Sequence, residues 1–335
     1  MLLRSVIISA LSLLTVEAEE LKIYSERHYD SDKTIFADFE KESGITVKVV
    51  KAKADELLAR LESEKSSPQA DLFITKDAAS LERATKAGLL SPIGSDFVKS
   101  QVPEGLRGKE DTWTALTMRA RVVVYAKDRV KKADLPKTYA DLADPKYRGN
   151  ILIRSSSSGY NRSLLSSIYH NEGKPAALKW AQGVKNNLAR PPQGGDRDQV
   201  RALAQGLGDY AVTNTYYLGI MEQSDNEDDR KARAAVNVLF PTSGENGTHV
   251  NVSGAGIVKG ATNAKNAKKF IEFILSDKAQ AKYQDLTSEY AVVENVEPND
   301  ILKAWGELKP DTTSLHHFLD NYEEAIKLFD LVGWK

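Results

Sequence analysis

The chain contains no cysteine. Thiolate metal sites, cysteine nucleophiles and disulfide bonds are therefore excluded, as is a membrane anchor on a lipid-modified cysteine. A metal held by side chains must be bound through oxygen or imidazole nitrogen. Because no disulfide supports the fold, its stability must come from a hydrophobic core, and 335 residues are enough for two domains of ordinary size.

A substantial net charge is also missing. The chain carries 46 Lys and Arg against 47 Asp and Glu, which gives a formal net charge of −1 at pH 7. The basic residues are scattered, so the sequence does not predict the positive face that duplex DNA or anionic lipid demands. We therefore expect no nucleic-acid partner.

Long apolar runs are absent except at the start of the chain. Residues 1–18 combine Arg4, an apolar stretch over residues 6–14 and a small-residue site ending at Ala18, the pattern of a cleaved secretory signal peptide. The stretch is shorter than the roughly 20 residues that a transmembrane helix needs. We expect a periplasmic protein whose mature chain begins at Glu19.

Strand and helix patterns alternate in the first part of the mature chain. Apolar or β-branched runs predict strands at residues 21–25, 44–50 and 70–75. Apolar side chains at helical spacing predict helices over residues 32–42, 55–65 and 79–87, with Gly88 ending the last one. This alternation predicts an α/β fold with a largely parallel sheet covered on both faces.

Two long β-type segments, residues 114–127 and 234–241, lie far apart in the sequence. We predict that they cross between two lobes and form the hinge. The predicted lobes are residues 19–118 plus 242–300 and residues 119–241 plus 301–335. Further helices are predicted over residues 264–275 and in the tail, residues 299–331, which we expect to pack on the second lobe.

Three polar motifs that contain tyrosine occur along the chain. They are Tyr24-Ser25-Glu26-Arg27-His28-Tyr29, Arg154-Ser155-Ser156-Ser157-Ser158-Gly159-Tyr160-Asn161 and Asn214-Thr215-Tyr216-Tyr217-Leu218-Gly219. In a regular strand, adjacent side chains point to opposite faces, so Tyr216 and Tyr217 of the third motif would point away from each other. Both can reach one point only at an irregular turn or a helix start, and the preceding Thr-Asn-Thr supplies a turn signal.

Together these motifs resemble the periplasmic ferric-iron-binding proteins of ABC transporters, in particular the subgroup found in cyanobacteria and some proteobacteria. The similarity extends through nearly the whole mature chain and includes the Ala-Asp-Leu-Phe, Leu-Leu-Ser-Pro and Asp-Pro-Lys-Tyr-Arg-Gly segments. The resemblance implies a two-lobed solute-binding fold of the Venus-flytrap type, without enzymatic activity. It also implies a monomer that delivers its cargo to an inner-membrane permease.

The resemblance further implies the metal and its ligands. Matched residue by residue, the ligands fall on His28 and Tyr29 of the first motif, Tyr160 of the second, and Tyr216 and Tyr217 of the third. The first two would come from one lobe and the three others from the second lobe. Lobe closure around Fe(III) in the intervening cleft would then complete the site.

The chemistry of ferric iron agrees with this ligand set. Fe(III) is a small, hard cation that suits phenolate oxygen, and a tyrosine, with a pKa of about 10, ionises at neutral pH only beside strong positive charge. Four phenolates and a neutral imidazole around Fe(III) leave a charge of −1, whereas three phenolates leave none. Arg27 and Arg154 of the motifs, together with Arg119 and Arg121, are candidates to offset a surplus negative charge from outside the coordination sphere.

The serine run permits two interpretations. Hydroxyl and backbone N–H groups of Ser156, Ser157 and Ser158 at a helix start could bind an anion such as carbonate or phosphate, which would act as a further iron ligand. Alternatively, they only cap the helix predicted over residues 161–168. Because five side chains could already bind the metal, we expect direct coordination, with the anion optional.

Other functions compete with iron binding. A receptor for another small ligand, such as a polyamine, thiamine, a sugar or an anion, shares the fold. A sugar site normally offers stacked tryptophans, yet the four tryptophans lie outside the three motifs. A hydrolase needs a nucleophile beside a base, and neither Gly-x-Ser-x-Gly nor His-Glu-x-x-His occurs. The remaining histidines, His170, His249, His316 and His317, are expected to be structural.

Overall fold

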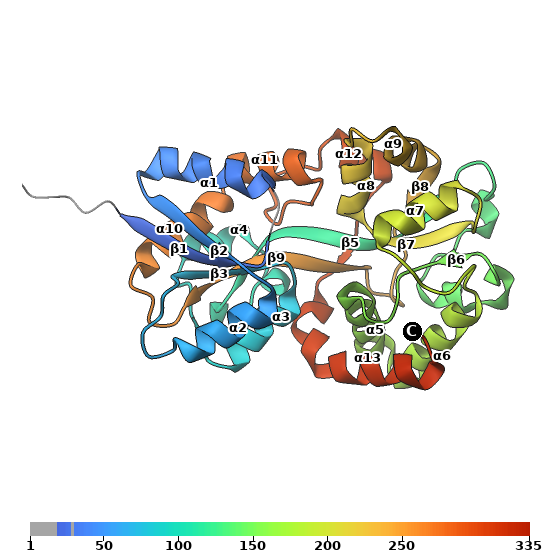
Figure 1. The fold of residues 1–335 in the computed structure, drawn as a ribbon, viewed down its shortest axis with the longest axis horizontal. Helices are drawn as coiled ribbons and strands as arrows, with labels where there is room; N and C mark the ends of the chain where they lie inside the picture. The colour runs from blue at the N-terminus through green and yellow to red at the C-terminus, as the bar shows by residue number, and fades with distance from the viewer. Residues whose placement is uncertain (1–18, 28–29) are drawn as a thin grey trace, which may run out of the picture.

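Two long strands, β5 (Thr114–Ala126) and β9 (Thr248–Val258), run through the middle of the molecule and connect two α/β halves (Figure 1). The computed structural model describes residues 19–27 and 30–335. The first part of β5 pairs with β9, and from Arg121 onward β5 pairs with strands of the second half. Both strands are therefore shared between the halves.

The first half is built from the beginning of the chain and from a later helical pair. Its elements are β1 (Glu20–Ser25), α1 (Asp30–Ser43), β2 (Thr46–Lys51), α2 (Ala54–Ser63), β3 (Leu72–Thr75), α3 (Ala78–Lys86), β4 (Leu90–Ser91), α4 (Asp96–Gln101), α10 (Ala264–Ile274) and α11 (Asp277–Thr287). The helices predicted from apolar spacing in this half are confirmed to within two residues at each end.

The second half contains the middle of the chain and its tail. Its elements are β6 (Ile151–Leu152), α5 (Gly159–Glu172), α6 (Lys174–Asn186), α7 (Asp196–Ala204), β7 (Tyr210–Asn214), α8 (Thr215–Glu222), α9 (Glu227–Ala234), β8 (Val236–Leu239), α12 (Asp300–Trp305), β10 (Pro310–Asp311) and α13 (Phe318–Val332). The tail is thus only partly helical, because β10 and a short 3-10 segment, Thr313–His317, interrupt it.

The sheet is mixed, with the order β2-β1-β3-β9-β5-β7-β6. Parallel pairs occur at its two ends, β1 with β2 and β3, and β6 with β7, whereas β9 and β5 pair antiparallel with each other and with β3 and β7. The prediction of a largely parallel sheet was wrong for the centre, because the strands that cross between the halves return in the opposite direction.

The hinge prediction was correct for one strand only. Residues 114–127 correspond to β5, but residues 234–241 form only the four-residue β8, which pairs with the second part of β5. The long partner of β5 is β9, a continuous strand that contains Gly254 and Gly256. Gly254 lies so close to the β5 backbone that a Cβ would clash with the carbonyl oxygen of Thr114, and a Cβ on Gly256 would clash with that of Thr112, just before β5. The predicted lobe boundaries stay a prediction.

Aromatic contacts stabilise each half. Phe36 and Phe39 of α1 meet Phe270 of α10 edge to face, with ring centroids 5.2 and 5.0 Å apart. In the second half, Trp180 of α6 stacks on Trp334, which follows α13, at 5.8 Å. Such rings bury large apolar areas and are the main contributors to core stability.

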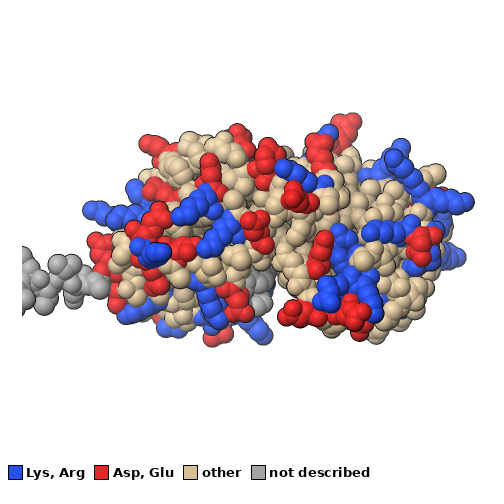
Figure 2. All heavy atoms as spheres, turned by 90° about the horizontal axis from the view of Figure 1, so that it is seen from above, with Lys and Arg blue, Asp and Glu red and all other residues tan. Residues whose placement is uncertain are grey.

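The surface matches the balanced composition. On the face drawn in Figure 2, acidic and basic side chains are interspersed over both halves. Within the part of the chain that the structure describes, no helix has the length and apolar content that a membrane crossing requires.

Candidate metal centre

A cleft of about 1260 Å³ separates the two halves. One wall comes from the first half and includes Glu26, Lys76 and the start of α2 and α3. The other wall comes from the first turns of α5 and α8 and from one face of α13. Three tyrosines predicted as ligands line the cleft, namely Tyr160, Tyr216 and Tyr217.

Tyr160 lies in the first turn of α5. The serine run forms a turn before this helix, in which the Ser158 N–H donates to the Ser155 carbonyl, and Gly159 begins the helix. Asn161 is completely buried, and its side-chain amide donates to the carbonyls of Arg154 and Ser155 at 2.7 and 3.1 Å. This buried amide fixes the turn and directs the neighbouring Tyr160 toward the cleft.

Tyr216 and Tyr217 lie where strand β7 ends and helix α8 begins. Asn214 has an extended backbone and precedes the first helical residue, Thr215, whose hydroxyl accepts from the Ala120 N–H of β5 at 3.1 Å. The two tyrosine rings lie 4.1 Å apart between centroids, inclined by 32°. The prediction that a helix start brings the two side chains together is confirmed.

The third tyrosine joins this pair. The hydroxyl oxygens of Tyr160 and Tyr216 are 3.0 Å apart, and the Tyr160 and Tyr217 rings meet edge to face at 6.5 Å. Among residues 19–27 and 30–335, no group of three or more His, Asp or Glu side chains is arranged to hold a metal ion. Phenol oxygens are therefore the convergent potential donors in the described part of the cleft.

Two guanidinium groups lie against the Tyr160 ring. The Cζ atoms of Arg154 and Arg121 are 5.4 and 5.8 Å from the ring centroid. Both arginines approach one carboxylate, Asp196, which accepts from Arg121 at 2.7 Å and lies 3.7 Å from Arg154. Two arginines and one aspartate leave a surplus of one positive charge beside the Tyr160 ring.

The environment of Tyr217 disfavours ionisation of its phenol. Burial raises the pKa of Tyr217 to about 12, and the nearby Tyr160 phenol and Asp196 carboxylate contribute to the increase. Without a bound cation, Tyr217 is therefore a neutral phenol at neutral pH. Its ionisation requires a strong positive charge at bonding distance.

The predicted anion residues differ in their positions. Ser157 and Ser158 line the cleft, but Ser156 is not among its lining residues, and its carbonyl accepts from Arg162 Nε at 2.9 Å. Ser158 is 6% exposed, and its Oγ has no hydrogen-bond partner among the described residues. A hydroxyl donor at the start of the 14-residue α5 fits an anion better than a cation.

The first motif is described only in part. His28 and Tyr29 lie outside the described residues, while Glu26 lines the cleft and pairs with Lys76 at 2.8 Å. Arg27 does not line the cleft. Its guanidinium is buried, 3.0 Å from Asp32 and 3.2 Å from Glu289, so it joins β1, α1 and the residues after α11.

Sequence reasoning missed part of the cleft. Tyr322 and Glu323 of α13 and Asn251 of β9 line it, although no motif marks them. The tail was predicted only as helical, and the wall that it contributes depends on the packing of α13 against α5.

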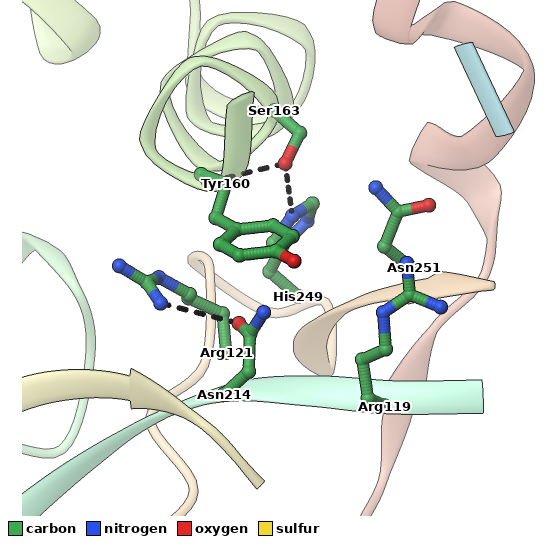
Figure 3. Close-up of a pocket in the computed structure, with 7 residues that line it drawn as sticks. All are labelled: Arg119, Arg121, Tyr160, Ser163, Asn214, His249 and Asn251. Atoms are coloured by element: carbon green, nitrogen blue, oxygen red, sulfur yellow. Dashed lines mark hydrogen bonds between the residues drawn. The ribbon is translucent and has the colours of Figure 1, made fainter. Parts of the chain in front are cut away.

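A second, very small pocket lies behind Tyr160. It measures about 10 Å³ and is lined by Arg119, Arg121, Tyr160, Ser163, Asn214, His249 and Asn251 (Figure 3). Tyr160, Ser163 and Asn251 also line the cleft, so the Tyr160 residue lies between the two spaces. A pocket of this size accommodates no more than one water molecule.

Two α/β halves, shared crossing strands and a cleft lined from both sides define a two-lobed solute-binding protein. The family described as bacterial extracellular solute-binding protein matches residues 67–306. The chain belongs to this family, whose members are solute-binding proteins and not enzymes.

Several of its relatives are named as iron-uptake or ferric-binding proteins. Iron uptake protein A1 of Synechocystis is 42% identical over 95% of this chain and 88% of that protein. The structure of the Trichodesmium protein IdiA (FutA) in complex with iron and citrate superposes with a TM-score of 0.89, at 41% identity over 94% of this chain and all of that one. The ferric binding protein of Campylobacter jejuni gives a TM-score of 0.86, at 40% identity over 94% of this chain and all of that one.

Proposed function

We propose that this protein binds Fe(III) in the cleft through the phenolates of Tyr160, Tyr216 and Tyr217, with His28 and Tyr29 completing the site from the first lobe. The convergence of three phenols, with two hydroxyl oxygens 3.0 Å apart, is the observation that carries the proposal. The names of the iron-uptake and ferric-binding relatives support the choice of metal.

The charges around the cleft fit a ferric cargo. Four phenolates and a neutral imidazole around Fe(III) carry −1, and the group of Arg121, Arg154 and Asp196 carries +1. The guanidinium carbon of Arg154 lies 5.4 Å from the centre of the Tyr160 ring, close enough for its charge to act on the complex. The arginines thus offset the surplus charge of the complex, and each phenol that binds iron releases its proton.

Capture follows from the position of the ligands on the two halves. In the open form, Fe(III) meets the three tyrosines of the second lobe, and closure about β5 and β9 brings His28 and Tyr29 to it. Binding stabilises the closed form because the metal has more ligands there. The closed, monomeric protein delivers the metal to an inner-membrane ABC permease from the periplasm.

An anion is an optional further ligand. The Ser158 hydroxyl and the N-terminus of α5 are donors at the edge of the cleft, and Ser157 lies beside them. Carbonate or the carboxylate of an organic chelator would fill any coordination position that the side chains leave open.

A visible absorption titration with chelated ferric iron tests the proposal. We expect a phenolate-to-iron charge-transfer band that saturates at one equivalent and is lost or strongly shifted in a Tyr216→Phe, Tyr217→Phe double variant. Tyr322→Phe is the matched control, because this phenol also lines the cleft, near Gly159 at the start of α5, but is not one of the three proposed ligands. A wild-type protein without the band contradicts the proposal, and an unchanged band in the double variant removes that pair from the site.

A further inference from the structure

The helix that carries Tyr160 is tied to β9 by two buried side chains. Ser163 Oγ lies 3.1 Å from the Tyr160 carbonyl and 3.3 Å from Nε2 of His249 (Figure 3). Ser163 is 4% exposed and His249 is 1% exposed. The first turn of α5 is therefore linked, through one serine, to a strand that is shared by both halves.

The hydrogen positions in this link follow from counting protons. A serine hydroxyl has a single proton, and Ser163 donates it to the Tyr160 carbonyl. His249 must then donate its Nε2 proton to the serine oxygen. Burial lowers the pKa of His249 to about 3 against the raising effect of Asp311, and Arg121 and Arg119 lower it further, so the imidazole stays neutral.

His249 is itself held from the opposite side. Its backbone N–H donates to the Tyr139 hydroxyl at 3.1 Å, and that hydroxyl donates to the Arg121 carbonyl of β5 at 2.6 Å. Further along the same strand, Gly254 and Ala255 pair with β3 of the first half. Strand β9 thus contacts both halves, and His249 links it to the helix of Tyr160 through Ser163.

We propose that Ser163 and His249 are positioning residues that hold Tyr160 in the orientation required for a ligand and couple this orientation to the shared strand β9. This inference rests on the proposed binding of iron. Neither residue need touch the metal. When the link is broken, the first turn of α5 adopts competing orientations. The apparent affinity then falls in proportion to the fraction of molecules in which Tyr160 is oriented for binding.

Four variants test the link: Ser163→Ala, His249→Leu, the double variant, and His249→Gln, which retains an N–H donor. Ser167→Ala is the matched control, because Ser167 is a fully buried serine of the same helix whose Oγ has no hydrogen-bond partner among the described residues. Each protein is titrated with ferric iron against citrate, and both the midpoint and the saturated absorption spectrum are recorded. Thermal unfolding of the metal-free proteins is measured in parallel.

We expect Ser163→Ala and His249→Leu to bind iron about tenfold more weakly, which is the effect of losing one buried hydrogen bond. The saturated spectrum should match the wild type, because the ligands are unchanged, whereas Tyr160→Phe should change it. The double variant should be no weaker than either single variant, since both break one link. His249→Gln should regain most of the affinity, and Ser167→Ala should bind as the wild type does.

Other outcomes overturn the inference. Wild-type affinity in both single variants, or additive losses in the double variant, would show that the link does not position Tyr160. A lower unfolding temperature with unchanged affinity would assign the two residues to stability alone. A wild-type protein that shows no charge-transfer band would instead overturn the proposed function, and this inference with it.

Discussion

Replacing Tyr217 with phenylalanine removes one phenol from the cleft and, if that phenol is an iron ligand, one proton from the binding reaction. The pKa of Tyr217 is about 12, so at pH 7 only about one molecule in 100,000 carries this phenolate before the metal binds. Deprotonation at pH 7 therefore costs about 7 kcal/mol, which the bond to Fe(III) must supply. The wild-type protein should accordingly release the Tyr217 proton on binding.

The sign and size of the pH dependence follow. Each proton released makes the affinity rise about tenfold per pH unit as long as the pH stays below the pKa of the phenol. Three phenolates predict a release of about three protons near pH 7, and a contribution from Tyr29 adds one more. Whatever the total, Tyr217→Phe should release one proton fewer than the wild type. For each pH unit, the factor by which its affinity rises should therefore be about ten times smaller than for the wild type.

Proton release can be measured directly in weakly buffered solution, with ferric nitrilotriacetate as the metal source and a pH-stat as the detector. Protons taken up by the chelator are the same for both proteins and cancel in the difference. Tyr322→Phe is the control and should release as many protons as the wild type. Equal release by wild type and Tyr217→Phe, with iron bound by both, would refute the assignment of Tyr217 as a phenolate ligand.

Three further substitutions test the surroundings of the site. Arg154→Met should weaken iron binding about tenfold or more in a citrate competition, because it removes a positive charge beside Tyr160; Arg197→Met, which removes a cleft charge elsewhere, should have a smaller effect. Arg27→Met should lower the free energy of unfolding in urea by about 3–5 kcal/mol, because it leaves two buried carboxylates without this partner. Gly219→Ala should destabilise the protein by about 1–3 kcal/mol in the same assay, because the added methyl group would overlap the side chain of Ser288, which packs on α8. Gly159→Ala, where the nearest neighbouring atom is 4.0 Å away, should be tolerated.

Local patterns predicted much of the first half and one feature of the site. Apolar spacing located α1, α2, α3 and α10 within a few residues, because these helices are amphipathic and bury one face. The adjacent tyrosines predicted an irregular turn or a helix start, and β7 ends at Asn214, directly before Thr215, the first residue of α8. In both cases the information lies within a few neighbouring residues.

Non-local pairing was harder to predict. The pattern of residues 234–241 is as typical of a strand as that of β9, but which of the two becomes the long partner of β5 depends on residues far away in the sequence. Glycines lowered the strand signal of β9, although Gly254 and Gly256 are what allow it to approach its neighbours. His249 likewise carried no signal of its own, because its role depends on Ser163 and Tyr139, which come from separate segments.

The pairing of β5 with β9 has a consequence for how the molecule is made. Residues that are distant in the chain must meet before either half is complete, and α13, near the C-terminus, forms part of the cleft wall. Such long-range contacts form late and slowly in folding. A chain whose tail has not yet docked therefore has no finished cleft, and under the proposed function metal uptake would report the arrival of the whole polypeptide at its native state. The proposed cargo would then stabilise both halves together, because it would bind only the complete fold.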